Sequence, residues 1–223
     1  MRRTLAAAAA LLACYVALSF LNDPRGYLGT DTGAKVATLE VMSDGEGLDP
    51  DIGYWAERWD PDGHYHPLYD SFRLDDRWVN VTTLPALYAG YPLYRLGGYR
   101  LALLLPMLGS VAAALAARGL ARRLGADDAV GWAAFWLVGL ASPFTIYALD
   151  FWEHSLGVGL IAWAGVLLID AVSEVPGGER PSWWRPVLAG VLFGTAASMR
   201  TEAYVYGGLA TAAACLYLSL IHI

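Results

Sequence analysis

The stretch SPFTIYALDFWEHS, residues Ser142–Ser155, ends one long apolar run, and a second apolar run follows it from Leu156. It carries three ionisable side chains within five residues: Asp150, Glu153 and His154. Ionisable groups where a chain leaves and re-enters a bilayer are costly to desolvate, so they usually face a wet cavity and have a function. Their spacing puts them on one face if this turn is helical. The stretch therefore predicts a membrane-embedded site rather than an anchored soluble domain.

The composition also indicates a membrane protein. Hydrophobic residues make up 57% of the 223 residues and charged residues only 16%, which is too apolar for one soluble domain. We therefore expect an all-α, polytopic membrane protein in contact with the lipid bilayer. Most of the acidic residues fall between Asn22 and Arg77. Because no basic surface faces a nucleic acid, that class of partner is excluded.

The first apolar run, Thr4–Leu21, has 18 residues and follows two arginines. This length is close to the roughly 20 residues that cross a bilayer. Residues 1–21 are therefore predicted to form the first transmembrane helix, with the amino terminus in the cytoplasm. A cleaved signal peptide is the alternative, because Leu11–Cys14 resembles a lipobox.

Residues 22–99 are polar and are predicted to form a large outer loop with short juxtamembrane helices. Gly29–Met42 predicts one such helix, because Thr30 or Asp31 can cap it. Trp78–Leu96 contains prolines and tyrosines and suits an amphipathic helix at the membrane interface. A membrane span in its place would put the next arginine cluster outside, against the positive-inside tendency.

Residues 100–217 are predicted to hold transmembrane helices two to six. Their expected bounds are Arg100–Ala117, Val130–Tyr147, Leu156–Ala171, Pro186–Ser198 and Ala203–Tyr217. This order puts Arg118, Arg122 and Arg123 in a cytoplasmic loop. We thus expect a multi-pass protein of the cell membrane with its site on the outer face. Three polar stretches would meet there: Asp31 with Lys35, Asp150–His154, and Arg200 with Glu202.

The last six residues, 218–223 (LSLIHI), resemble the translation of a transposon-end adaptor used in sequencing libraries. We therefore expect the reading frame to leave the gene near Tyr217. On this interpretation the chain is the amino-terminal part of a longer protein. Residues 218–223 are therefore excluded from the prediction of the fold.

Several short motifs follow one another in a fixed order across most of residues 1–217. They are Asp31 in GTDTGAK, His66–Tyr69 (HPLY), the Ala117–Gly125 turn, Ser142-Pro143, Trp152–His154 (WEH) and Arg200–Glu202 (RTE). In their order and shared sidedness they resemble the GT-C membrane glycosyltransferases, which include protein O-mannosyltransferases, aminoarabinose transferases and many bacterial polyprenyl-phosphate-sugar enzymes. The resemblance implies GT-C-like transmembrane helices. It also implies transfer of a sugar, with inversion, from a polyprenyl-phosphate donor to an acceptor that stays unspecified.

The resemblance further implies roles for single residues. Asp31 would be the general base, and cations would hold the developing charge of the phosphate leaving group. Arg200 is the favoured cation because its guanidinium fork matches two phosphate oxygens, and Lys35 is a second candidate. Glu153 and His154 join Asp31 as catalytic candidates. The other substrate-binding candidates are His66, Asp150 and Glu202.

Simpler roles stay open for the same residues. Asp31 could only cap a helix, Glu153 and His154 could be interfacial polar groups, and Arg200 could reach lipid headgroups. No cofactor is expected, although a divalent cation on oxygen ligands is left open. The rival function is a transporter or flippase that uses the acids as an ion relay. A ligase or polymerase of lipid-linked glycans would share the same geometry.

Overall fold

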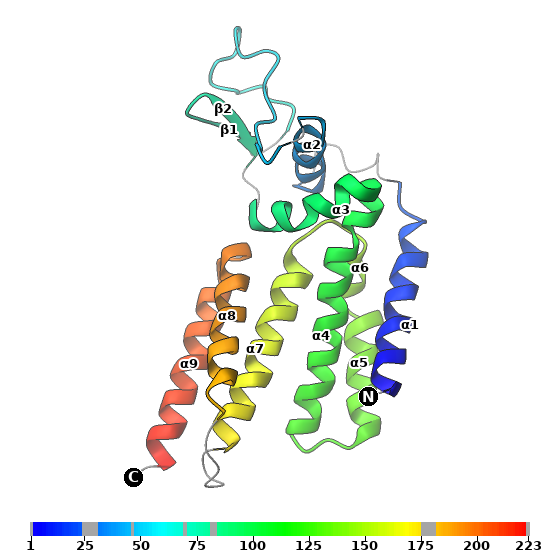
Figure 1. The fold of residues 1–223 in the computed structure, drawn as a ribbon, viewed down its shortest axis with the longest axis vertical. Helices are drawn as coiled ribbons and strands as arrows, with labels where there is room; N and C mark the ends of the chain where they lie inside the picture. The colour runs from blue at the N-terminus through cyan, green and yellow to red at the C-terminus, as the bar shows by residue number, and fades with distance from the viewer. Residues whose placement is uncertain are drawn as a thin grey trace.

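The computed structural model describes residues 2–23, 31–45, 47–68, 71–80, 84–174 and 182–221. The protein is mostly helical, at 73%, and Figure 1 shows a bundle of long helices with smaller elements over one end. The helices are α1 (Arg2–Ser19), α2 (Asp31–Asp44), α3 (Leu84–Ala102), α4 (Leu104–Arg123), α5 (Asp128–Leu140), α6 (Phe144–Ala148), α7 (His154–Glu174), α8 (Trp184–Met199) and α9 (Glu202–Ile221). The strands β1 (Ser71–Leu74) and β2 (Arg77–Asn80) form an antiparallel hairpin.

Four of the described helices are long and apolar enough to cross a membrane: α1, α4, α7 and α9. They coincide with the predicted first, second, fourth and sixth spans, which confirms the expected helical and apolar character of the chain. The predicted third span is divided instead into α5, with 13 residues, and α6, with five. Pro143 explains the division, because the residue before a proline, here Ser142, avoids helical backbone angles.

The smaller elements gather at one end of the bundle, which we call the cap end. Figure 1 shows α2, α3 and the hairpin there, with α6 and the starts of α7 and α9 below them. α3 lies across the bundle, and a break at Gly97 and Gly98 turns the chain into α4. Gly98 has a φ of 63°, which glycine adopts without strain.

Two predicted helices of the loop differ in outcome. The helix expected at Gly29–Met42 is confirmed as α2, and its alternative cap Thr30 lies outside the described residues. The helix expected at Trp78–Leu96 is confirmed only from Leu84, because Trp78 belongs to β2. Asp75, with a φ of 55°, lies in the tight turn that pairs β2 with β1.

α4 and α7 pack closely near the cap end because glycines stand at the contact. A Cβ on Gly109 would lie 2.4 Å from the backbone nitrogen of Leu156, and one on Gly159 would lie 2.7 Å from the carbonyl oxygen of Gly109. Ser155 Oγ also donates a 2.8 Å hydrogen bond to the carbonyl of Pro106 in α4. These contacts fix the start of α7 against α4.

Ion pairs join the helices at the opposite end, which we call the arginine end. Arg123 of α4 donates two hydrogen bonds of 2.6 Å to the carboxylate of Asp170 in α7. Arg118 donates a 2.7 Å hydrogen bond to Asp128 at the start of α5, and Arg3 of α1 lies 3.5 Å from the same carboxylate. The predicted arginine cluster therefore lies at the end of the bundle away from the cap.

Residues 218–221 continue α9 as a helix. His222 and Ile223, the last residues of the expected adaptor segment, lie outside the described residues, as does Tyr69 of the HPLY motif.

Candidate functional site

Lys35 of α2 lies at the centre of the candidate site. Its side chain is only 2% exposed, and its Nζ lies 2.7 Å from Asp31 Oδ2 and 2.5 Å from Glu153 Oε2. Asp31 is the first residue of α2, so the i,i+4 spacing of a helix brings it to Lys35. Glu153 comes from the turn that precedes α7. A buried ammonium needs such partners, since burying an unpaired charge is strongly unfavourable.

Glu153 extends this contact to a third part of the chain. Its Oε1 lies 3.4 Å from Arg200 Nη1, and Arg200 Nη2 donates a 2.6 Å hydrogen bond to Glu202 Oε1. The stem of Arg200 lies over Gly157 in the first turn of α7, where an added Cβ would come 3.2 Å from Arg200 Cγ. The small residue at position 157 therefore leaves room for the guanidinium beside Glu153.

Asp150 contacts α2 through a second hydrogen bond. Thr32 Oγ1 donates to Asp150 Oδ1 at 2.5 Å. The turn that carries Asp150 packs against α3 at Gly90. A Cβ added to Gly90 would lie 2.4 Å from Cζ of Phe151, so the Phe151 ring occupies that space. This turn is not helical, and α7 begins only at His154. Asp150 and Glu153 are thus brought together by the turn and by α2, not by a shared helical face.

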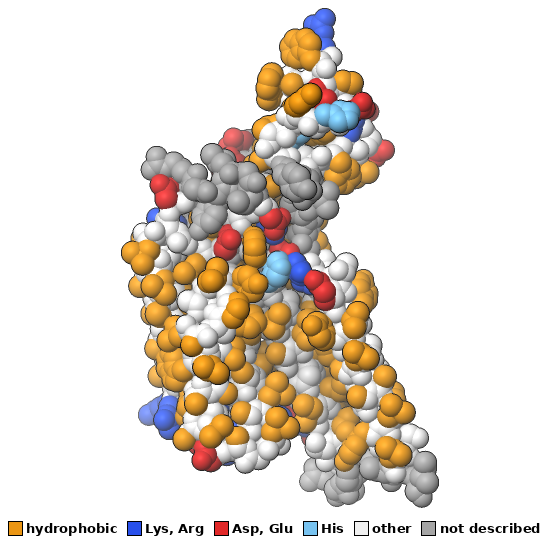
Figure 2. All heavy atoms as spheres, turned by 180° about the vertical axis from the view of Figure 1, so that it is seen from behind, with side chains coloured by type: hydrophobic (Ala, Val, Ile, Leu, Met, Phe, Trp, Pro, Cys, Tyr) orange, Lys and Arg blue, Asp and Glu red, His pale blue; other side chains and the backbone are white. Residues whose placement is uncertain are grey.

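Three segments that are far apart in the sequence therefore meet in one network at the cap end. We call its six charged members the ionic cluster: Asp31, Lys35, Asp150, Glu153, Arg200 and Glu202. Figure 2 shows charged side chains gathered between the projecting hairpin and the largely hydrophobic surface of the bundle. The sequence predicted that these residues meet on one side, and the geometry of the cluster agrees with that expectation.

The carboxylates of the cluster differ in their electrostatic environment. Burial opposes ionisation of Glu153, but attraction and a hydrogen bond from Lys35 outweigh it and lower the pKa of Glu153 below its ordinary 4.5. Burial dominates at Asp150 and raises its pKa above 3.8, although the hydrogen bond from Thr32 opposes the change. Two nearby carboxyl groups with pKa values moved in opposite directions are typical of a functional site.

His154 lies beside the cluster among aromatic rings. Its ring centroid is 5.2 Å from that of Tyr147, with an interplanar angle of 27°, and 4.9 Å from that of Trp152, with an angle of 34°. Tyr147 and Trp152 are 5.6 Å apart. We call these three residues the aromatic triad. The sequence drew attention to the WEH motif but gave no reason to add Tyr147, which reaches the others only because the chain turns after α6.

His66 is the predicted substrate-binding residue that the structure places elsewhere. It stacks on Trp78 of β2 with centroids 5.3 Å apart and lies 4.7 Å from the ring of Tyr54. Its Nδ1 also interacts with the backbone of Leu68. No hydrogen bond or ion pair among the described residues joins it to the ionic cluster. His66 packs in the loop and hairpin because its flat ring fits between these aromatic side chains.

Thr32 is the polar residue that sequence reasoning missed. Its hydroxyl bridges α2 to the turn at Asp150, and no local pattern distinguishes it from any other helical threonine. In the described part of the chain, no group of three or more His, Cys, Asp or Glu side chains is arranged to hold a metal ion. The acids of the cluster are instead paired with Lys35, Arg200 or the Thr32 hydroxyl.

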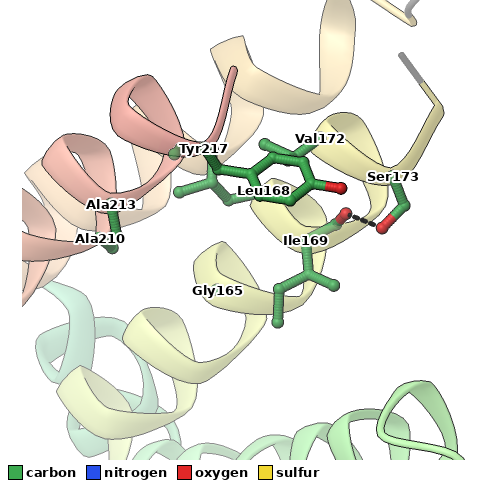
Figure 3. Close-up of a pocket in the computed structure, with 9 residues that line it drawn as sticks. Gly165, Leu168, Ile169, Val172, Ser173, Ala210, Ala213 and Tyr217 are labelled. Carbon is green, nitrogen blue, oxygen red and sulfur yellow. Dashed lines mark hydrogen bonds between the residues drawn. The ribbon is translucent and has the colours of Figure 1, made fainter. Parts of the chain in front are cut away.

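Two apolar cavities lie along the bundle. One, of about 470 Å³, lies between α7 and α9 (Figure 3), where Tyr217 extends toward Leu168 and Val172. The other, of about 520 Å³, lies between α8 and α9 and is lined by Ala197 and Ala203, among others. Ala197 and Ala203 stand on either side of the Arg200–Glu202 turn in the sequence, so one end of the second cavity lies near that turn, although no residue of the ionic cluster lines it.

Comparison of the chain with protein-family models, curated proteins and solved structures gives no match.

Proposed function

We propose that this protein is an integral membrane glycosyltransferase of the GT-C type. It transfers a sugar from a polyprenyl-phosphate donor to an acceptor hydroxyl, with inversion at the anomeric carbon. The observation that carries the proposal is the ionic cluster, in which an accessible carboxylate and a guanidinium from distant segments lie on either side of a buried lysine–glutamate pair. Such an arrangement suits a reaction that removes one proton and releases one phosphate.

Asp31 acts as the general base in this proposal. Its side chain is 44% exposed, so an acceptor can reach it, and the hydrogen bond from Lys35 fixes its Oδ2. The carboxylate takes the proton of the acceptor hydroxyl while the acceptor oxygen forms a bond to the anomeric carbon. The bond from that carbon to the phosphate oxygen breaks on the opposite face, and its electron pair leaves with the phosphate. Because the acceptor oxygen attacks the face opposite the leaving phosphate, the configuration at the anomeric carbon is inverted.

Arg200 binds the leaving phosphate. A guanidinium offers five N–H donors in a planar fork, and the two described contacts to Glu153 and Glu202 use only two of them. Lys35, the second candidate, is enclosed by its two carboxylates. We therefore assign Lys35 to holding Asp31 and Glu153 in place.

The apolar cavity between α8 and α9 supports a lipid-linked donor. It is lined by Ala203 near the cluster and by Ala212 farther along α9, a distance of about 14 Å at 1.5 Å per residue. A donor with its phosphate at Arg200 can lay its first isoprene units in this cavity. The shape matches a ligand with one charged end and one apolar chain.

The distribution of arginines supports a cap end on the outer side of the membrane. Arg118, Arg122 and Arg123 follow the apolar part of α4, and Arg2 and Arg3 begin α1 at the same end of the bundle. The positive-inside tendency places such residues in the cytoplasm. The amino terminus is then cytoplasmic, and the ionic cluster faces the outer leaflet.

The position of the charges favours this enzyme over an ion-relay transporter. In α4, α5, α7, α8 and α9, the charged residues all lie near a helix end. A transporter instead concentrates its substrate and ion sites near the bilayer midplane, commonly at broken helices.

Transfer from a polyprenyl-phosphate sugar in proteoliposomes tests the proposal, with Asp31→Asn compared against wild type. We expect the variant to lose at least about 100-fold in rate, the usual contribution of a general base. Asp62→Asn, an exposed loop acid, is the matched control and should transfer at the wild-type rate. A folded Asp31→Asn protein with undiminished transfer would rule out Asp31 as the base, and ion flux without any transfer would support the transporter.

A further inference from the structure

We propose that the aromatic triad, Tyr147, Trp152 and His154, is the binding site for the pyranose ring of the sugar. This inference rests on the proposed glycosyltransferase function. It assigns a part of the site that is separate from the base, Asp31, and from the phosphate ligand, Arg200.

The rings of the triad pack against one another beside the ionic cluster, and each stays partly exposed. The three centroids are 4.9–5.6 Å apart, with interplanar angles between 27° and 35°. All three side chains are half-buried. They come from the end of α6, the following turn and the first residue of α7, and the helix contact at Ser155 fixes that segment against α4. The backbone that carries the rings is therefore held in place.

Two nitrogen atoms of the triad lack a hydrogen-bond partner. Trp152 Nε1 and His154 Nδ1 are both buried, and neither has an acceptor or donor among the described residues. The nearest charged oxygen to His154 Nδ1, Oε1 of Glu153, lies 3.9 Å away, beyond hydrogen-bond distance. Buried polar groups in native proteins are almost always paired, so two adjacent exceptions point to a missing ligand.

The chemistry of these groups selects a sugar. A pyranose presents C–H groups that pack on aromatic rings, and its hydroxyl oxygens accept hydrogen bonds from Trp152 Nε1 and His154 once the rings turn to expose these nitrogens. An alkyl chain would satisfy the ring faces but neither nitrogen. A phosphate would satisfy the nitrogens but is better held by a guanidinium.

The location of the triad also fits a sugar between the other two sites. His154 follows Glu153, which contacts both Lys35 and Arg200. A donor phosphate at Arg200 therefore places its sugar next to Glu153, with one ring face toward the triad and the anomeric carbon toward Asp31.

Binding measurements on the purified protein in detergent test this assignment. The probes are polyprenyl phosphates that carry mannose, glucose or galactose, and bare polyprenyl phosphate. Trp152→Phe keeps a ring and removes the N–H, Tyr147→Leu removes a ring face, and Trp136→Phe in α5 is the matched control. We expect each triad variant to raise the Kd for at least one glycosylated probe by about tenfold. The Kd for the bare carrier should change less than about twofold, and the control should match wild type for all probes.

The outcomes separate this inference from the proposed function. Glycosylated probes that bind the triad variants as tightly as wild type, or a loss equal to that for the bare carrier, would overturn the triad as a sugar site and leave the enzyme proposal intact. If wild-type protein binds no polyprenyl phosphate, saturation-transfer NMR with methyl pyranosides tests whether the triad binds a sugar by itself. A signal lost in Trp152→Phe would keep the sugar site while the enzyme proposal fails, and no wild-type signal would overturn both.

Discussion

The two ends of the bundle hold their charges in different ways. At the arginine end, the Arg123 and Asp170 side chains are 32% and 26% exposed, and water screens their attraction. At the cap end, the Lys35 and Glu153 side chains are 2% and 5% exposed. Solvated pairs contribute about 0–1 kcal/mol to stability, whereas removal of one partner from a buried pair costs about 3–5 kcal/mol. Among the described residues, the buried charged side chains, Lys35 and Glu153, both lie at the cap end, which concentrates the polar chemistry there.

Removal of the buried cation should have the largest effect. Lys35→Met leaves Glu153 buried without its main partner, so we expect the free energy of unfolding to fall by about 3–5 kcal/mol. Arg123→Met at the other end should cost about 1 kcal/mol or less. Denaturation in detergent measures both, and the double variant Lys35→Met with Glu153→Gln should recover part of the loss. Equal losses of stability at the two ends would show that the Lys35–Glu153 pair is no more dependent on burial than the Arg123–Asp170 pair.

A second prediction concerns how tightly α7 packs along its length. Gly109→Ala forces a Cβ against the backbone of Leu156 near the cap end, and overpacking of this kind costs about 1–3 kcal/mol. Gly165→Ala lies farther along α7, where an added Cβ meets nothing within 4 Å. The Gly165→Ala substitution should leave the free energy of unfolding unchanged or raise it by up to about 1 kcal/mol. A shift of the unfolding temperature in the same direction for both variants would show that the cap end is no tighter.

The smallest expected effect is the pH dependence of the two buried acids. Glu153 has a lowered pKa, so its contribution to stability is present above its ordinary pKa and disappears as the pH falls through the folded value. Asp150 has a raised pKa, so its contribution is present in acid and disappears as the pH rises through the folded value. Glu153→Gln should therefore flatten the acid loss of stability, and Asp150→Asn should gain on wild type as the pH rises.

Unfolding temperatures recorded from about pH 3 to pH 7 give the two slopes. Asp62→Asn, in the exposed loop, serves as the control substitution. Parallel curves for the Asp150 and Glu153 variants would show that the two carboxyl groups share one environment.

The sequence predicted the parts of the fold that depend on local composition. Long apolar runs identified the four spanning-length helices, and the arginines in the last turns of α4 identified one end of the bundle. It did not predict the hairpin at Trp78, because a strand of four residues leaves too short a pattern to separate from a helix. It also missed the break at Ser142, where a proline outweighs an otherwise apolar helical run.

The site shows the same division. The charged residues were recognisable because an ion beside an apolar run is unusual. Their pairing was not, since Lys35 and Glu153 are 118 residues apart and nothing local encodes which cation meets which acid. His66, a substrate-binding candidate because of its HPLY motif, packs away from them in the loop and hairpin, and a motif does not show which way its loop folds. Thr32 and Tyr147 contribute through contacts that only the folded chain creates.

The salt bridge between Lys35 and Glu153 also sets an order of events during biosynthesis. At about 5–20 residues per second, a ribosome makes Glu153 roughly 6–24 s after Lys35. During that interval Asp31, on the same helix, is the partner that the described residues offer the lysine, so water must solvate the rest of its charge. The cap-end segment that carries α2 can complete its packing on the bundle only once the start of α7 has been made, so this salt bridge forms late in folding.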